Sequence, residues 1–294
     1  MATDGTVLVV GGDSMLGAVT ASQLAASGVH VIPTSRRGTP GSLPLDLAAS
    51  PTSWTLPEGI SAAVLCAAVT STEECRRHPE VARLVNVEAT AELAHRLAGN
   101  GARVMLLSTN LVFDGTLCCT PAEATRCPRT AYGRMKAEAE EAILQLGEMA
   151  TVVRLTKVLG QSLSIVMRWR EAFNHRQTVR PLADLTLAPV SPSLAAGAIT
   201  EAVRSKLSGI LQVSATSDLS YADVAGRLAS IWGFPGELVQ PTTVAEAGVI
   251  LEHVPRHTTL DTTRLRLACD IAPPDPWQAV EAAAGAVRTG RGQQ

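Results

Sequence analysis

An apolar strand that runs directly into a glycine-rich turn and a helix constrains the fold of this chain more than any other feature. Thr6-Val-Leu-Val-Val10 is a continuous, mostly β-branched run, typical of a strand buried on both faces of a parallel sheet. Gly11-Gly-Asp-Ser-Met-Leu-Gly17 follows at once, residues 18–26 have helical composition, and Val29-His-Val-Ile32 is the next predicted strand. This order predicts one βαβ unit of about 30 residues with its glycines between strand and helix.

The same unit predicts a dinucleotide-binding site. Gly11 permits the tight turn, and the amino terminus of the helix that follows offers N–H groups and a positive dipole end to a pyrophosphate. After the second strand, Ser35-Arg36-Arg37 contains no acidic residue to bond a ribose 2′-hydroxyl, and the two arginines could hold a 2′-phosphate. The sequence therefore favours NADPH over NADH. The alternative is that both arginines are solvated in a surface loop.

Further strands are predicted at residues 61–70, 104–109, 151–155 and 209–214, and helices at residues 73–97, 162–177, 221–232 and 277–287. Strands that recur with helical runs between them indicate an α/β fold with a doubly wound parallel sheet of the Rossmann type.

Composition excludes several classes of function. The chain has 294 residues, of which 46% are hydrophobic and 18% charged, with a net charge of -2, so neither nucleic acid nor an acidic membrane is an expected partner. No apolar run approaches the ~20 residues of a membrane span, and residues 1–5 do not resemble a signal peptide. The six cysteines lack metal-ligand spacing, so we expect no metal site and reduced thiols in a cytoplasmic protein.

Tyr132 and Lys136 are candidate catalytic residues. They stand four apart in a helical run that begins at Ala131, so a phenol and an ammonium share one helix face. A neighbouring cation lowers the pKa of a tyrosine, which would let Tyr132 exchange a proton near neutral pH. Ser108 and Thr109 end the preceding strand, where ligands bind in open α/β sheets. Alternatively, Tyr132 is an ordinary helical residue and Lys136 is solvated.

Two motifs in order carry a family resemblance. Ser108-Thr-Asn-Leu-Val-Phe-Asp-Gly115 and Tyr132-Gly-Arg-Met-Lys136 resemble the extended short-chain dehydrogenase/reductases, and within them the dTDP-4-dehydrorhamnose reductase group. The resemblance implies that Thr109 orients a substrate carbonyl, that Tyr132 gives its oxygen a proton, and that Lys136 lowers the tyrosine pKa and bonds the nicotinamide ribose. It also implies an NADP-binding domain over residues 1–160, with a strand near 209–215 returning to it, and a mostly substrate-binding lobe over residues 161–294.

The resemblance further implies a set of cofactor contacts. Ser14 stands where the family usually has the middle glycine of its turn, Asp46 and Leu47 match residues beside the adenine, and Ala67 and Ala68 match the small residues under the ribose. The implied cofactor-binding residues are Gly11, Ser14, Met15, Leu16, Gly17, Ser35, Arg36, Asp46, Leu47, Ala67, Ala68, Asn86 and Lys136.

The expected function is NADPH-dependent reduction of a nucleotide-linked 4-keto-6-deoxy sugar or a related ketone. The sequence departs from the family at two stretches that face the sugar, Asn110-Leu111 and Thr156-Lys157-Val158, so the ketone can differ. Dehydratases of the same superfamily carry an Asp-Glu pair after the threonine as acid and base. Asn110-Leu111 supplies neither carboxylate, which disfavours dehydration. The alternative is a non-catalytic NADP-binding regulatory subunit of the same fold. The expected partner is a nucleotide-sugar, and a homodimer is compatible with the sequence.

Overall fold

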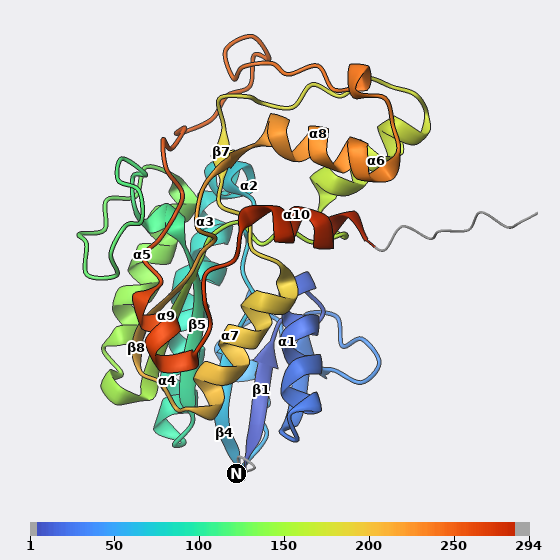
Figure 1. The fold of residues 1–294 in the computed structure, drawn as a ribbon. Helices are drawn as coiled ribbons and strands as arrows, with labels where there is room; N and C mark the ends of the chain where they lie inside the picture. Colours follow the sequence, from blue (N-terminus) through green and yellow to red (C-terminus); the bar gives the residue numbers. More distant parts are fainter. Residues whose placement is uncertain (1–4, 286–294) are drawn as a thin grey trace, which may run out of the picture.

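A seven-stranded parallel sheet forms the centre of the molecule (Figure 1). The computed structural model describes residues 5–285. The strand order is β3-β2-β1-β4-β5-β6-β8, and every pairing within this sheet is parallel. The chain builds outward from β1 in one direction and then, from β4, in the other. This reversal is the point where open α/β sheets bind ligands, and the predicted Rossmann-type fold is confirmed.

The strands and helices occur in alternation along most of the chain. The strands are β1 (Thr6–Val10), β2 (His30–Ser35), β3 (Leu43–Pro44), β4 (Ile60–Leu65), β5 (Arg103–Thr109), β6 (Ala150–Leu155), β7 (Thr186–Leu187), β8 (Gly209–Val213) and β9 (Leu219–Ser220). The α-helices are α1 (Met15–Ala26), α2 (Thr72–Arg77), α3 (Pro79–Arg83), α4 (Thr90–Gly99), α5 (Ala131–Leu144), α6 (Ser164–Asn174), α7 (Pro192–Arg204), α8 (Tyr221–Trp232), α9 (Thr263–Cys269) and α10 (Pro276–Ala284).

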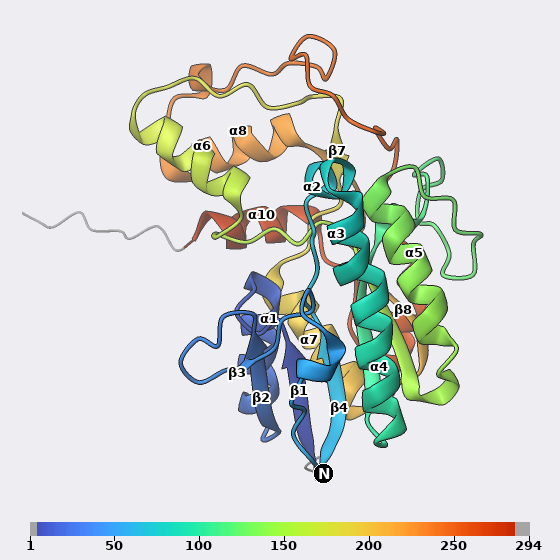
Figure 2. The same ribbon diagram turned by 180° about the vertical axis from the view of Figure 1, so that it is seen from behind.

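Helices cover both faces of the sheet because its strands are apolar on both sides. Helices α1, α7 and α9 cover the face seen in Figure 1, where Leu24, Ile199 and Leu265 are fully buried against the strands. Helices α4 and α5 cover the other face, seen in Figure 2, through residues such as Leu93 and Ile143. The two cores fix α5 directly beside β5 and β6.

A third apolar core lies beyond the carboxyl ends of the strands. Helices α6, α8 and α10 pack there around Phe173, Leu228 and Val280, and the short antiparallel pair β7–β9 joins this lobe to the sheet region. Both views place the lobe above the end of the sheet where β1 leads into α1 (Figures 1 and 2). Within residues 5–285 no helix is long and apolar enough to cross a membrane.

Three predicted elements differ from the observed ones. The helix predicted for residues 73–97 is divided, because Pro79 begins a new helix at α3 and a π-helical segment, Leu84–Ala89, precedes α4. The strand predicted for residues 61–70 ends at Leu65, since the stretch beyond it forms a loop at the carboxyl edge of the sheet. The final helix ends at Ala284, and residues 286 and 287 of its predicted range lie outside the described part of the chain.

Candidate active and cofactor site

The turn after β1 has the geometry that a close approach of backbone requires. Gly11 has a φ of +78°, and a Cβ there would lie 2.9 Å from the backbone of Ala67. Thr34 holds the turn, because its carbonyl accepts from the N–H of Gly12 at 2.7 Å and its hydroxyl from that of Gly11 at 3.2 Å. The turn therefore lies between the ends of β2 and β4, and the space there admits only a glycine at position 11.

Ser14 completes this turn. It is the N-cap of α1: its hydroxyl donates to the carbonyl of Gly11 at 2.8 Å and accepts from the N–H of Gly17 at 3.1 Å. A Cβ on Gly17 would lie 2.2 Å from the Gly11 carbonyl oxygen, so the third glycine of the motif is sterically required. Met15 and Leu16, on the first turn of α1, are partly buried.

The loop after β2 is organised by hydroxyl groups. Ser35 is buried, and its hydroxyl lies 2.7 Å from that of Ser42 and accepts from the N–H of Thr39 at 2.8 Å. The Ser35 hydroxyl is therefore used to fold the loop, and the exposed guanidinium groups at this edge are those of Arg36 and Arg37.

The remaining predicted adenine and ribose positions lie on neighbouring loops. The Asp46 carboxylate accepts from the N–H of Ala48 at 2.9 Å, and Leu47 is buried. Ala67 and Ala68, which follow β4, are partly buried.

Asn86 stabilises the loop after β4 by hydrogen bonds to its backbone. The side chain is 1% exposed; its Oδ1 accepts from the N–H of Val69 at 2.8 Å and its Nδ2 donates to the carbonyl of Val69 at 2.9 Å. Both ends of the amide thus bond the backbone of one residue, Val69, which fixes the loop beyond Ala68. The structure places Asn86 as a support for this loop, with its amide occupied within the protein.

The three predicted catalytic residues come from two adjacent elements. Thr109 ends β5, and its hydroxyl accepts from the N–H of Leu111 at 3.2 Å. Tyr132 and Lys136 lie on the first two turns of α5. The helix lies directly on the backbone that follows Thr109, because a Cβ on Gly133 would be 2.2 Å from the carbonyl oxygen of Leu111. This contact brings the tyrosine-bearing turn against the end of β5.

Lys136 is a buried residue whose amine makes no hydrogen bond within residues 5–285, and this amine is not one of the fully buried unpartnered atoms there, so it keeps some contact with solvent. Its side chain is 2% exposed, and burial lowers its pKa from 10.5 to about 8, against the opposing effects of Glu140 and Cys66. Burial also raises the pKa of the Cys66 thiol to about 12. A desolvated, unpaired ammonium with a perturbed pKa is typical of a functional site.

Tyr132 departs from the expectation in one respect. Burial raises the pKa of its phenol, and the nearby Cys75 adds to the rise. The prediction that Lys136 lowers this pKa is wrong for the protein alone, because the loss of water around the phenolate outweighs any favourable effect of the ammonium. The phenol is therefore protonated at neutral pH, which suits a proton donor.

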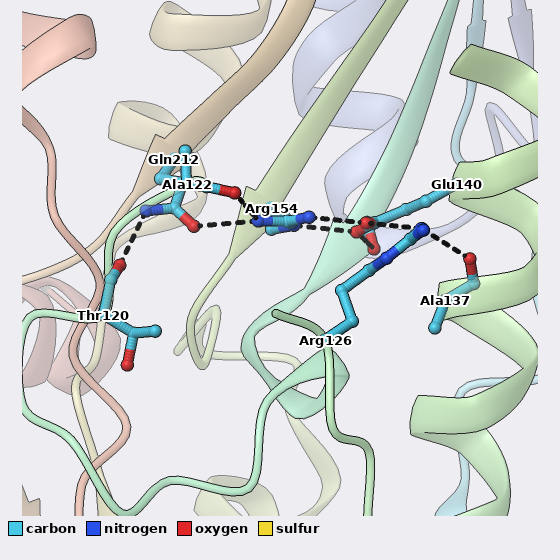
Figure 3. A network of polar contacts seen from close by, with 8 residues as sticks. Thr120, Ala122, Arg126, Ala137, Glu140, Arg154 and Gln212 are labelled. Atoms are coloured by element: carbon cyan, nitrogen blue, oxygen red, sulfur yellow. Dashed lines mark hydrogen bonds and ion pairs between the residues drawn. The ribbon is translucent and has the colours of Figure 1, made fainter. Parts of the chain in front are cut away.

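A buried polar network lies beneath these residues and was not predicted (Figure 3). Glu140 is fully buried one turn after Lys136; its carboxylate accepts from Ser108 Oγ at 2.5 Å and from Arg154 Nε and Nη2 at 2.9 and 2.7 Å. Two signals in the sequence could have indicated it. Tyr132, Lys136 and Glu140 follow at four-residue spacing, and Arg154 is the one charged residue in an apolar strand.

The chain segment between α8 and α9 also contacts α5 and the loop before it. The carboxylate of Glu252 accepts from the N–H of Ala131 at 3.0 Å, at the amino terminus of the helix, and lies 3.5 Å from Arg134. His253 Nε2 lies 2.6 Å from the carbonyl oxygen of Asp114, in the loop between β5 and α5. Residues from the carboxyl-terminal part of the chain therefore border the turn that carries Tyr132.

Other features of the described residues lie away from this site. A hollow of about 300 Å³ opens beside β8, lined by Gln212, Asp261 and Arg264 among others, and contains none of the predicted site residues. Within residues 5–285, no group of three or more His, Cys, Asp or Glu side chains is arranged to hold a metal ion.

Comparison with known proteins identifies the family. The family model described as the RmlD substrate binding domain matches residues 5–288, nearly the whole chain. The chain belongs to this family. It is 31% identical over 201 residues to a dTDP-4-keto-6-deoxy-D-glucose reductase of Streptomyces niveus, covering 67% of this chain and 69% of that protein. The resemblance of its motifs to the dTDP-4-dehydrorhamnose reductase group is confirmed at the level of this family.

Two further relatives indicate the range of the family. The chain is 27% identical over 215 residues to the methionine adenosyltransferase 2 subunit beta of Bos taurus, and the match covers 69% of this chain and 63% of that protein. The chain therefore spans about three fifths of the length of such relatives. The fold matches a dTDP-4-dehydrorhamnose reductase of Bacillus anthracis solved in complex with NADP, with a TM-score of 0.81 and 19% identity over 96% of this chain and 98% of that chain.

Proposed function

We propose that this protein is an NADPH-dependent reductase of a nucleotide-linked 4-keto-6-deoxy sugar or a related ketone. The observation that carries the proposal is the amine of the buried residue Lys136, which bonds no described residue, keeps some solvent contact and lies one helical turn from Tyr132, against the end of β5. A buried cation without a partner is unfavourable unless a ligand completes its site. The Streptomyces niveus relative, named a reductase of a dTDP-linked keto sugar, supports the substrate class.

The residues at the β1–α1 turn fit a dinucleotide. A Cβ at Gly11 or Gly17 would collide with neighbouring backbone, so the turn is built for the closest approach of backbone, and the capped amino terminus of α1 provides N–H groups for a pyrophosphate. Arg36 and Arg37 are exposed after β2, where they would neutralise a 2′-phosphate. The nicotinamide would supply the hydride for the carbonyl carbon.

The chain itself would orient the ketone and supply a proton. Tyr132, protonated at neutral pH because burial raises its pKa, would donate its phenolic proton to the carbonyl oxygen as the C–H bond forms, giving an alcohol. Thr109 would hold the same oxygen from the end of β5, and the Lys136 ammonium would bond the ribose and stabilise the phenolate left behind.

The test is ketone-dependent oxidation of NADPH, followed by the loss of absorbance at 340 nm. The panel includes dTDP-4-dehydrorhamnose and related keto sugars, and the variants are Tyr132→Phe and, as a matched control, Tyr221→Phe on α8 in the lobe. We expect turnover by the wild-type chain and by the control, and a fall in kcat of about 10²-fold or more in Tyr132→Phe. Full activity in Tyr132→Phe would contradict the assigned role.

A second candidate function is a regulatory subunit that binds NADP without turnover. The observation that favours it is that several relatives carry the name methionine adenosyltransferase 2 subunit beta. Calorimetric binding of NADPH with no oxidation by any ketone in the panel would favour this function, and purified methionine adenosyltransferase would then be the partner to test.

A further inference from the structure

Two separate chain segments carry the proposed catalytic groups, and their relative position is not fixed by local structure. Thr109 belongs to β5, whereas Tyr132 and Lys136 belong to α5, and a loop that spans residues 113–130 separates the two. A reaction that needs all three groups on one carbonyl depends on how β5 and α5 are held together at this end.

The structure provides two contacts, one on each side of Thr109. After it, the carbonyl of Leu111 touches α5 at Gly133, where a Cβ would be 2.2 Å from the oxygen. Before it, Ser108 Oγ donates to Glu140 Oε1 at 2.5 Å. On the helix these contacts flank Lys136, since Gly133 precedes it by one turn and Glu140 follows it by one turn.

Basic side chains hold both oxygens of the Glu140 carboxylate. Both of its oxygens bond the Arg154 guanidinium, and Arg126 lies 3.6 Å from Oε2. Arg154 is 1% exposed, donates to the carbonyl of Ala122 at 2.8 Å, and lies over the ring of Phe113 at 4.9 Å. Figure 3 shows the Arg154 guanidinium between Ala122 and Gln212 on one side and the Glu140 carboxylate on the other.

Charge alone does not explain this arrangement. A buried ion pair is at best weakly stabilising compared with apolar residues of the same volume, so stability gives little reason to place one here. Its fixed geometry does give a reason: the carboxylate oxygen presented to Ser108 sets the side-chain position of the residue next to Thr109.

We propose that Glu140 is a positioning residue that fixes Thr109 on β5 relative to the Tyr132–Lys136 pair on α5 through its bond to Ser108. The inference rests on the proposed reductase function and adds a residue to it. Glu140 acts through Ser108 and through its own helix, and touches neither substrate nor cofactor in this scheme.

Ser108→Ala is the decisive variant, because a change at Glu140 or Arg154 would leave a buried charge unpaired and lower the stability of the whole chain by about 3–5 kcal/mol, which would obscure an effect on position alone. The matched control is Thr151→Val, which also removes one buried strand hydroxyl bonded at 2.5 Å, in that case to the carbonyl of Leu207 at the opposite end of the sheet. Ser108→Thr keeps the hydroxyl and serves as the conservative variant.

The measurements are the melting temperature, the Kd for NADPH, kcat and KM for the ketone, and the isotope effect with NADPH deuterated at the transferred position. We expect both Ser108→Ala and Thr151→Val to melt at lower temperature. Only Ser108→Ala should lose kcat, by roughly ten- to a hundred-fold, since a misplacement of Thr109 by about 1 Å is sufficient for such a loss. Its isotope effect should be larger than that of the wild type, and its Kd for NADPH should stay within about twofold of the wild-type value. Ser108→Thr should recover most of the activity.

Three results would overturn the inference. They are an unchanged kcat in Ser108→Ala, an equal loss of kcat in Thr151→Val, and a loss in Ser108→Ala that Ser108→Thr does not recover. Absence of ketone reduction by the wild-type chain would instead overturn the proposed function, and the inference with it. The two failures are therefore distinguishable in one set of assays.

Discussion

Replacing the buried lysine of the site should make the protein more stable while it removes activity. Lys136 is 2% exposed, and burial lowers its pKa from 10.5 to about 8. Each unit of pKa corresponds to about 1.36 kcal/mol, so the lowered pKa of Lys136 means that its charge destabilises the folded chain by about 3 kcal/mol at pH 7. Lys136→Met keeps the volume and removes the charge, so it should raise the free energy of unfolding by about that amount.

The sign of the pH dependence follows from linkage. Below pH 8 the amine is charged in both states and the full penalty applies; between pH 8 and 10.5 the folded chain loses the proton while the unfolded chain keeps it. The wild type therefore gains stability relative to Lys136→Met as the pH rises through this window. The advantage of the variant should fall from about 3 kcal/mol at pH 7 to about 1.4 kcal/mol at pH 9.5.

Urea unfolding of the cofactor-free protein at the two pH values measures this directly. The control is Lys157→Met, because Lys157 is exposed and its replacement should change stability by no more than about 0.5 kcal/mol at either pH. A Lys136→Met variant that is less stable than wild type at pH 7, or an advantage that persists undiminished at pH 9.5, would refute the reasoning. The same variant should lack ketone-dependent oxidation of NADPH.

Three further predictions test the cofactor turn, the 2′-phosphate contact and the buried ion pair. Gly17→Ala should raise the Kd for NADPH at least about tenfold in a fluorescence titration with little change in secondary structure, because its Cβ would lie 2.2 Å from a backbone oxygen of the turn. Arg36→Ala should weaken NADPH more than NADH, so equal weakening of the two cofactors would contradict a 2′-phosphate contact. Arg154→Met should lower the free energy of unfolding by about 3–5 kcal/mol, whereas the double variant Arg154→Met/Glu140→Leu should recover most of that loss.

The fold was predictable because its signals are local. A β-branched run of the kind buried on both faces, a glycine turn and a helix follow each other within residues 6–26, and this order is typical of the first βαβ unit of a parallel sheet. The start of α5 at Ala131 and the strand that ends at Thr109 were predicted at the residues where the structure places them. Helical spacing alone set Tyr132 and Lys136 on one face.

The roles of individual polar groups were less predictable, because they depend on contacts between distant segments. Ser14 and Ser35 remain predicted cofactor contacts, and the structure adds that their hydroxyls bond the turn and the loop that contain them. Asn86 was expected beside the cofactor, and the structure adds that its amide bonds the N–H and the carbonyl of Val69. A sequence pattern does not reveal which hydrogen bonds of a hydroxyl or an amide side chain are made within the protein.

The sequence by itself determined a parallel sheet with a glycine turn at its switch point and a phenol and an amine one helical turn apart, since these follow from short-range periodicity and backbone sterics. Only the tertiary structure decided the pKa values of the site, because burial, which raises the pKa of Tyr132 and lowers that of Lys136, comes from segments far apart in the chain. The same holds for Glu140 and Arg154, whose pairing joins α5 to β6 and exists only once the sheet has formed.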